Sequence, residues 1–433
     1  MDMKYLQRAI TNKILSRMKL DQVIVLSGAR QTGKTTLCVD MIPQFLNLPF
    51  TYISFDDPDE RLRFRHSGIS ILETIKTPLV ILDEVQKIPV LFEHLKFVID
   101  KQKRAINKVK KTFIITGSSE LLLLKNIKET LAGRAALLYL FPFSLAEVLE
   151  YQSKSLLTQL WEGKKIKNED IKNFDALSPE KKRTAMRMAK IHRTWGGFPP
   201  VWQREENEHK INWLKDYRTT YLERDISDVG QVSNLDMFSL VQKMLCSRSA
   251  QLLSISEIAR DVTLAVNTVK RYINLLQLSL QCYLIPPFFS NISKRFVKSP
   301  KLYFMDNGLI KAILGEMSIH DSALYENWIF SELLKWKQLQ AREPELFFYR
   351  TAAGKEIDFL LIGEQQIIPI EIKFSQVISS TDARNVISFL EEYQHLASTG
   401  IIVYPGKEMH QVVKNVWAIP DWFLFVEILS LQK

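Results

Sequence analysis

The stretch Val23-Ile24-Val25-Leu26-Ser27-Gly28-Ala29-Arg30-Gln31-Thr32-Gly33-Lys34-Thr35-Thr36 decides the fold of this chain. An apolar, β-branched run ends at Gly28, four residues follow, and then come Gly33, Lys34 and Thr35, with a helix-compatible segment behind them. This is the pattern G-x-x-x-x-G-K-[ST] in the strand and helix setting of a phosphate-binding loop. The glycines let backbone N–H groups turn toward a phosphate, Lys34 reaches the β- and γ-phosphates, and Thr35 offers a hydroxyl to Mg²⁺.

The loop therefore predicts a nucleotide-binding segment with contacts from every residue between positions 28 and 36: Gly28, Ala29, Arg30, Gln31, Thr32, Gly33, Lys34, Thr35 and Thr36. Five apolar runs alternate with helical patterns on either side of it, at 22–27, 49–55, 78–84, 111–119 and 135–141. This alternation predicts an α/β domain with five buried strands in a parallel sheet, and the ligand lies at the carboxyl ends of such strands.

Length and composition agree with a globular protein of several domains. With 433 residues, 46% of them hydrophobic, the chain exceeds one hydrophobic core. The net charge of +10 is compatible with a polyanionic partner, although it is also compatible with a simple role in solubility. Three scattered cysteines, the absence of a signal-peptide pattern and the absence of a long apolar run predict a cytoplasmic protein without a membrane partner.

Two acidic residues follow the third apolar run. We assign Asp83 to Mg²⁺ and Glu84 to the orientation of the attacking water. Thr116 and Ser118, at the end of the fourth run, are placed to contact the γ-phosphate or the water. Arg134, just before the fifth run, is a candidate arginine finger that acts on a neighbouring subunit; the alternative is an exposed arginine at a turn.

Several of these segments resemble one prokaryotic family of AAA+ ATPases that carry a C-terminal domain of unknown function. The resemblance rests on 28–36, Phe55-Asp56-Asp57, 82–86, 116–119, 131–134, Gly196-Gly197-Phe198-Pro199, 221–226 and 302–309. It implies the AAA+ strand order, ATP as the nucleotide, a sensor role for residues 116–118 and the finger role for Arg134. It also predicts a homo-oligomer, for which a hexameric ring is one arrangement.

Residues 254–304 have the layout of a winged helix-turn-helix: two short helices and a basic hairpin. The predicted recognition helix offers Asn267, Lys270 and Arg271 to DNA, and the wing offers Lys294, Arg295, Lys298 and Lys301. Winged helices also dock proteins, so a protein partner is the alternative.

A second group of acidic residues lies near the C-terminus. Asp358 ends one predicted strand, Glu371 and Lys373 share a face of the next, and Glu326 lies on the preceding helix. These carboxylates are a candidate second Mg²⁺ site, with Lys373 able to stabilise developing charge. The set Asp358, Glu371, Lys373 resembles the PD-(D/E)xK signature of restriction-endonuclease-like nucleases, without an evident proline. The sequence leaves open whether such a site cuts.

The predicted fold class is thus α/β: an AAA+ P-loop parallel sheet with a helical lid, a winged helix-turn-helix, and a restriction-endonuclease-like domain. The predicted boundaries are 1–143 for the ATPase core, 144–210 for the lid, 211–305 for the helical linker and winged helix, and 306–433 for the nuclease-like domain. The predicted function is an ATPase that hydrolyses ATP with Mg²⁺ to act on duplex or branched DNA. The alternative is a nucleotide-dependent signalling or defence switch that docks a protein and has an inactive nuclease site.

Overall fold

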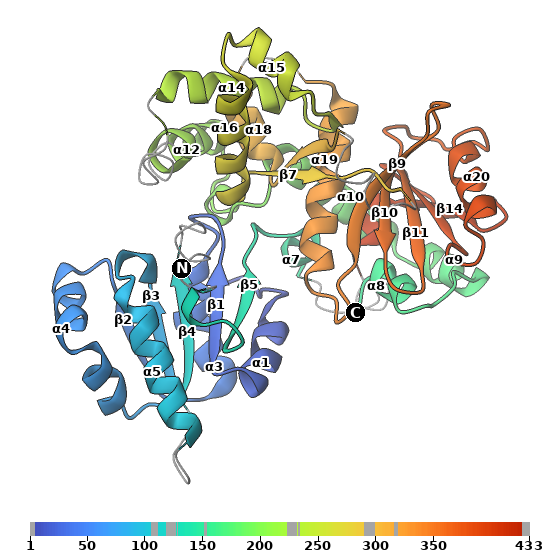
Figure 1. Cartoon of the computed structure of the whole chain (residues 1–433). Helices are drawn as coiled ribbons and strands as arrows, with labels where there is room; N and C mark the ends of the chain where they lie inside the picture. Colours follow the sequence, from blue (N-terminus) through green and yellow to red (C-terminus); the bar gives the residue numbers. More distant parts are fainter. Residues whose placement is uncertain are drawn as a thin grey trace.

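The computed structural model describes residues 5–104, 111–117, 127, 129–150, 154–222, 232, 234–289, 299–315 and 319–426, with the backbone alone at 221 and 222. Figure 1 shows the N-terminal α/β domain, blue to teal, at the lower left, and the later elements in a second body above and to its right. None of the helices in these ranges combines the length and the apolar composition that a membrane span requires.

The N-terminal domain is built on a five-stranded sheet in the order β2-β3-β4-β1-β5. Every neighbouring pair is parallel. The strands are β1 (Val23–Ser27), β2 (Phe50–Ser54), β3 (Leu79–Asp83), β4 (Thr112–Gly117) and β5 (Ala135–Tyr139). Because only β4 separates β1 from β3, the loop after β1 and the acidic residues at the end of β3 lie close together at the carboxyl ends of the strands, as the sequence predicts.

Helices cover both faces of this sheet. Alternate residues of β1 point to opposite sides, so Val23 and Val25 pack with α4 (Pro58–Thr74) and α5 (Val90–Arg104). Ile24 and Leu26 pack with α1 (Thr11–Leu20) and with the helix after the loop, which runs through α2 (Lys34–Thr36), a π-helical turn (Leu37–Met41) and α3 (Ile42–Leu46). The prediction of five fully buried strands was wrong for β2 and β5, because these strands form the sheet edges and are only partly covered.

A helical segment follows β5. It comprises α7 (Leu145–Val148), α8 (Leu156–Trp161), α9 (Asn168–Asp175), α10 (Pro179–Trp195), α11 (Pro199–Trp202), α12 (Asn207–Tyr217) and a π-helical turn (Arg218–Leu222). Phe174 of α9 makes ring contacts with Trp422 and Phe423, so part of this segment packs against the C-terminal domain (Figure 1). A role as a lid over the nucleotide loop stays a prediction.

The next unit contains three helices and a small antiparallel sheet. Its elements are α14 (Leu235–Ser247), β6 (Gln251–Leu252), α15 (Ile255–Asp261), α16 (Val266–Leu278), β7 (Cys282–Ile285) and β8 (Lys301–Phe304), with strand order β6-β8-β7. Ser254 caps α15 through its side chain, which accepts a hydrogen bond from the Glu257 N–H at 3.4 Å. The residues of the predicted wing between 290 and 298 lie outside the described ranges.

The C-terminal domain is a mixed sheet flanked by helices, with strand order β13-β14-β12-β11-β10-β9. Its elements are α18 (Asn307–Leu314), α19 (Asp321–Lys337), β9 (Glu345–Arg350), β10 (Glu356–Ile362), β11 (Ile367–Ile372), α20 (Arg384–Glu392), β12 (Gly400–Tyr404), β13 (His410–Val413), β14 (Val416–Pro420) and α21 (Asp421–Leu424). The order α19, three strands, α20, strand is the one that the sequence predicts. The strands β13 and β14 are additional to that prediction.

Candidate functional site

The phosphate-binding loop turns sharply between β1 and α2. A Cβ at Gly28 would lie 2.3 Å from the Leu140 carbonyl oxygen, so only glycine fits beside the backbone that follows β5. Gly33 has φ 91°, a left-handed conformation, and directly precedes α2. The Lys34 Nζ donates hydrogen bonds to the carbonyls of Gly28 at 2.9 Å and Ala29 at 3.0 Å, and thus lies inside the loop's own turn.

Asp83 at the end of β3 joins the loop to the neighbouring strands. Its Oδ2 accepts hydrogen bonds from the Thr35 hydroxyl at 2.9 Å and the Tyr52 hydroxyl at 3.0 Å. Its Oδ1 accepts from the Thr116 hydroxyl and from the Glu84 N–H. The structure therefore brings the predicted residues Thr35, Asp83 and Thr116 together, while Ser118 lies outside the described ranges.

Tyr52 is a member of this cluster that the sequence analysis missed. Burial, with the neighbouring Asp83 carboxylate, raises the pKa of Tyr52 to about 12. The hydroxyl therefore stays protonated and donates to Asp83. Ser54 pairs with Asp83 in the parallel register of β2 and β3, which places Tyr52 two residues upstream on the adjacent strand. Knowledge of the register between β2 and β3 would have identified Tyr52 as a neighbour of Asp83.

Glu84 follows Asp83 and has φ 57°, a left-handed conformation that is uncommon for a residue with a side chain. Its carboxylate accepts a hydrogen bond from the Gln86 side-chain amide. An uncommon backbone conformation of this kind is often found at functional sites, where it fixes the position of one side chain.

Arg134 lies at the amino end of β5, whereas the loop lies at the carboxyl end of the adjacent strand β1. Val23 pairs with Ala135 and Ser27 with Tyr139, so the residue before β5 is at the far end from Gly28. Its guanidinium forms a two-point ion pair with Asp100 of α5, at 2.8 Å and 3.0 Å, and this hydrogen bonding raises the pKa of Arg134. Arg134 therefore does not reach the nucleotide loop of its own chain.

The C-terminal carboxylates surround a lysine of the chain itself. Lys301 of β8 is 3% exposed, and its Nζ lies 2.7 Å from Glu356 Oε1, 3.1 Å from Glu326 Oε1 and 3.2 Å from Asp358 Oδ1. Burial alone would lower the pKa of Lys301, but the carboxylates outweigh burial and raise that pKa above its usual value. The prediction that Lys301 contacts DNA was wrong, because β8 turns this side chain toward α19 and β10.

Glu371 and Lys373 are the remaining residues of this cluster, and of the two only Glu371 is buried. The Glu371 Oε1 accepts from Lys373 at 2.7 Å, whereas its Oε2 is buried and has no hydrogen-bond partner among the described residues. Burial and the charge of Asp358 raise the pKa of Glu371 to about 8 and that of Glu326 to about 7. Within the described ranges, no set of three or more His, Cys, Asp or Glu side chains is arranged to hold a metal ion. The predicted metal trio Glu326, Asp358 and Glu371 is thus not brought together as such a set, and Lys301 takes the central position.

The predicted recognition helix α16 has an exposed polar face. Asn267, Lys270 and Arg271 are all exposed, and their spacing places them on one side of the helix. Val269, Tyr272 and Ile273 are buried on the other side. The wing residues Lys294, Arg295 and Lys298 lie outside the described ranges.

The parallel sheet and the loop–Asp83 cluster define the class of protein: a P-loop nucleotide-binding fold of the AAA+ type. Residues 20–149 match the family described as AAA domain. Residues 190–319 and 321–424 match two domains of unknown function, DUF8612 and DUF4143.

Relatives and solved structures extend this comparison. An uncharacterized protein of Mycobacterium tuberculosis is 28% identical over 423 residues, which cover 95% of this chain and 84% of that protein. An uncharacterized protein of Methanocaldococcus jannaschii is 26% identical over 83% of this chain and 76% of that protein. The ORC1 protein of Aeropyrum pernix in complex with DNA has 13% identity and a TM-score of 0.30, covering 72% of this chain and 93% of that one. A RuvB mutant of Thermotoga maritima has 12% identity and a TM-score of 0.30, covering 65% and 89%. Structural similarity at this level does not identify a function.

Proposed function

We propose that this chain is a Mg²⁺-dependent ATPase that acts on DNA in the cytoplasm. The observation that carries the ATPase is the hydrogen bond between Thr35 of the loop and Asp83 of β3, with Glu84 beside it. This bond supports the proposal, because the loop, two oxygen donors and the carboxylate of Glu84 then lie together at the carboxyl ends of β1 and β3.

The oxygen donors suit Mg²⁺. Mg²⁺ prefers hard oxygen ligands, and Thr35 Oγ1 and Asp83 Oδ2 are 2.9 Å apart. These two residues would hold the ion, directly or through its water shell. When bound, Mg²⁺ supplies charge neutralisation at the β- and γ-phosphates.

The chain's own groups do the remaining work. The N–H groups of residues 28–36 bind phosphate oxygens at the start of a helix, where the backbone dipoles favour negative charge. Lys34 exchanges its loop carbonyls for phosphate oxygens, since its ammonium already lies within the turn. Glu84 orients the attacking water, and Gln86 holds the Glu84 carboxylate by a hydrogen bond.

A direct test is ATP turnover and nucleotide binding by the wild-type chain and by Lys34→Ala. We expect the wild type to release phosphate from ATP in the presence of Mg²⁺ and the variant to lose both activities, because the loop loses its cation. If the wild type neither binds nor hydrolyses ATP, the proposal is wrong.

The finger role of Arg134 requires a second subunit, because Arg134 lies at the amino end of β5, away from the phosphate-binding loop of its own chain. We propose a homo-oligomer, such as a hexameric ring, in which Arg134 leaves its partly exposed pairing with Asp100 for the γ-phosphate of a neighbour. Ion pairs that water reaches are weak, so this exchange is accessible.

Arg134→Ala should lower turnover at least about tenfold while ATP still binds, since a finger stabilises the transition state and not the bound substrate. Mixing Arg134→Ala with Glu84→Gln chains should restore turnover, because mixed neighbours assemble one complete site. Asp100→Asn is the matched control and should keep the rate. Wild-type turnover by Arg134→Ala would contradict the finger.

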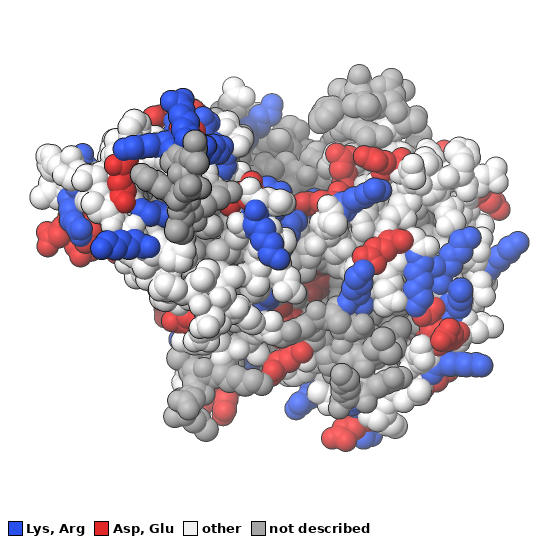
Figure 2. Space-filling view, turned by 90° about the horizontal axis from the view of Figure 1, so that it is seen from below, with Lys and Arg blue, Asp and Glu red and all other residues white. Residues whose placement is uncertain are grey.

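For DNA, the proposal rests on the unit from α14 to β8. Its helix and strand order, with the sheet order β6-β8-β7, supports the proposal of a winged helix, and Asn267, Lys270 and Arg271 form an exposed polar face on α16. Figure 2, which views the molecule from the side away from α16, shows Lys and Arg interspersed with Asp and Glu among the residues drawn in colour, and no continuous basic surface is visible on that side. The net charge of +10 therefore does not by itself locate the DNA contact, and α16 is the better candidate.

The double variant Lys270→Gln/Arg271→Gln should weaken duplex binding and reduce the slope of log affinity against log salt by about two, because each lost phosphate contact removes about one unit. Lys165→Gln/Lys172→Gln, with the same change in charge on another exposed segment, is the control and should bind as the wild type. Fluorescence anisotropy over a salt series measures both. Equal effects of the two double variants would contradict a specific role of α16.

The position of Lys301 favours a second candidate function, a nucleotide-dependent switch whose C-terminal domains dock a protein partner and whose nuclease-like site does not cut. An ammonium among Glu326, Glu356 and Asp358 occupies the place that a catalytic metal would need. Incubation of supercoiled plasmid with the chain, ATP and either Mg²⁺ or Mn²⁺ should leave the plasmid intact. Metal-dependent nicking that is lost in Asp358→Ala would show that the cluster is a nuclease site after all.

A further inference from the structure

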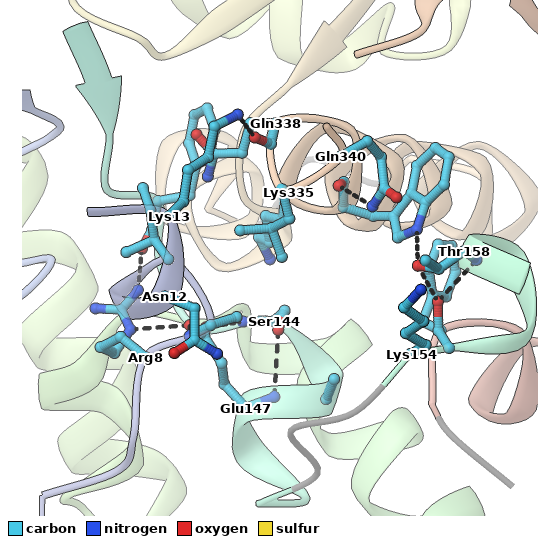
Figure 3. Close-up of a pocket in the computed structure, with 18 of the residues that line it drawn as sticks. Arg8, Asn12, Lys13, Ser144, Glu147, Lys154, Thr158, Lys335, Gln338 and Gln340 are labelled. Carbon is cyan, nitrogen blue, oxygen red and sulfur yellow. Dashed lines mark hydrogen bonds and ion pairs between the residues drawn. The ribbon is translucent and has the colours of Figure 1, made fainter. Parts of the chain in front are cut away.

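Arg8 connects the phosphate-binding loop to the segment that leaves the AAA domain. It lies just before α1, is 5% exposed, and its guanidinium reaches three acceptors. The Nη1 donates to the Thr32 carbonyl of the loop at 2.7 Å, Nη2 to the Phe141 carbonyl at 2.5 Å, and Nε to Glu147 Oε1 at 3.1 Å. Figure 3 shows Arg8, Ser144, Glu147 and Lys335 lining one pocket, a cavity of about 610 Å³.

The contact with Thr32 has a consequence for phosphate binding. A trans peptide is planar, so the Thr32 carbonyl and the Gly33 N–H point in opposite directions. By holding the Thr32 carbonyl on the outside of the loop, Arg8 keeps the Gly33 N–H turned to the inside, where a phosphate is bound. Gly33 has φ 91°, a conformation that glycine adopts readily, so the residue itself does little to fix the orientation of this peptide.

Glu147 connects Arg8 to the segment that contacts α19 of the C-terminal domain. Glu147 also accepts from the N–H groups of Ala9 and Ser144, each at 2.8 Å. The adjacent Leu145 N–H donates to Glu332 Oε2 of α19 at 2.8 Å.

Lys335, one turn further along α19, returns to the same segment. Its Nζ donates to Glu332 at 2.8 Å and to the Phe143 carbonyl at 3.0 Å. Buried hydrogen bonds thus run from the loop through Arg8 and residues 141–147 to α19. Such groups are costly to leave unpaired, so a displacement at one end is opposed at the other.

We propose that Arg8 is a positioning residue of the nucleotide site: it orients the Thr32–Gly33 peptide and transmits the state of the loop through Glu147 to α19. This inference rests on the proposed nucleotide binding. A purely structural staple would hold the fold together but would not make α19 respond to nucleotide.

The experiment compares wild type, Arg8→Gln and Glu147→Gln with a non-hydrolysable ATP analogue and Mg²⁺, using nucleotide affinity and amide hydrogen exchange. We expect Arg8→Gln to weaken affinity about tenfold or more, since a buried charge-assisted hydrogen bond is lost. At saturating analogue, the wild type should gain protection in the loop, in residues 141–147 and in α19. Arg8→Gln should gain it in the loop alone. Glu147→Gln, which leaves the Thr32 contact in place, should keep near-wild-type affinity and lose only the protection of α19.

Arg17→Gln is the matched control, because Arg17 pairs with Asp21 on the same α1 and has no contact with the loop in the described structure. It should behave as the wild type in both measurements. Unchanged affinity in Arg8→Gln together with an unchanged response of α19 in both variants would overturn this inference alone. A wild-type chain that binds no nucleotide would overturn the proposed function as well. Thermal unfolding of each variant separates loss of fold from loss of transmission, and Glu147→Gln carries the test of transmission if Arg8→Gln does not fold.

Discussion

Glu84→Gln will lower the steady-state rate of ATP hydrolysis on the order of 10²- to 10⁴-fold, while ATP still binds with close to wild-type affinity. The carboxylate can accept a proton from the attacking water and the amide cannot, whereas the two side chains have nearly the same shape. The amide oxygen can still accept the hydrogen bond from Gln86, so the left-handed backbone at residue 84 is retained. Phosphate release and equilibrium binding of ATP, measured on the same preparation, separate the two effects.

Two variants bracket this result. Lys34→Ala should lose binding and hydrolysis together, because it acts on the phosphates and not on the water. Glu60→Gln changes a half-buried carboxylate of α4 that pairs with Arg63, outside the loop–Asp83 cluster, and should leave both unchanged. If Glu84→Gln hydrolyses ATP at the wild-type rate, another group orients the water, and the assignment of Glu84 is wrong.

The arrangement of the loop and Asp83 could be predicted because these residues are local in sequence or follow directly from topology. Residues 28–36 form one loop, and Asp83 ends a strand whose apolar run identifies it as central. In a parallel sheet the carboxyl ends of such strands meet at one edge, so the proximity of Thr35 and Asp83 follows from the fold class. Tyr52 could not be found in this way, since its contact depends on the register between β2 and β3.

Lys301 and Arg8 show what sequence patterns could not supply. Lys301 lies at the end of the predicted basic hairpin, and the basic composition of that hairpin favours a contact with nucleic acid. Its actual partners are 25 to 57 positions away along the chain, on α19 and β10. Arg8 contacts residues 24, 133 and 139 positions away. Neither periodicity nor motif spacing carries information on such pairs, because they depend on how segments far apart in the sequence pack together in three dimensions.

Lys301→Met will destabilise the chain by about 3 kcal/mol at pH 8, because it removes the one ammonium among buried carboxylates and keeps the volume of the side chain. The loss will be smaller at pH 5. The pKa of Glu326 is already raised to about 7 and that of Glu371 to about 8. Carboxylates with raised folded-state pKa values bind more protons in the folded than in the unfolded chain, so their unfavourable effect grows as pH rises from the unfolded value toward the folded one. Chemical denaturation at the two pH values measures the difference.

The same variant tests whether Lys301 stands in for a metal ion. Millimolar Mn²⁺ should raise the unfolding temperature of Lys301→Met more than that of the wild type, since the vacated carboxylates then have no cation of their own. Lys373→Met is the matched control: Lys373 contacts Glu371 at 2.7 Å at the margin of the cluster, and its side chain is 33% exposed. Its removal should cost less than that of Lys301, because water reaches the partly exposed Lys373 side of this pair. A Lys301→Met chain that is as stable as the wild type at both pH values, and indifferent to Mn²⁺, would mean that the carboxylates neither need the ammonium nor bind a metal in its place, and the idea that Lys301 stands in for a metal ion would be wrong.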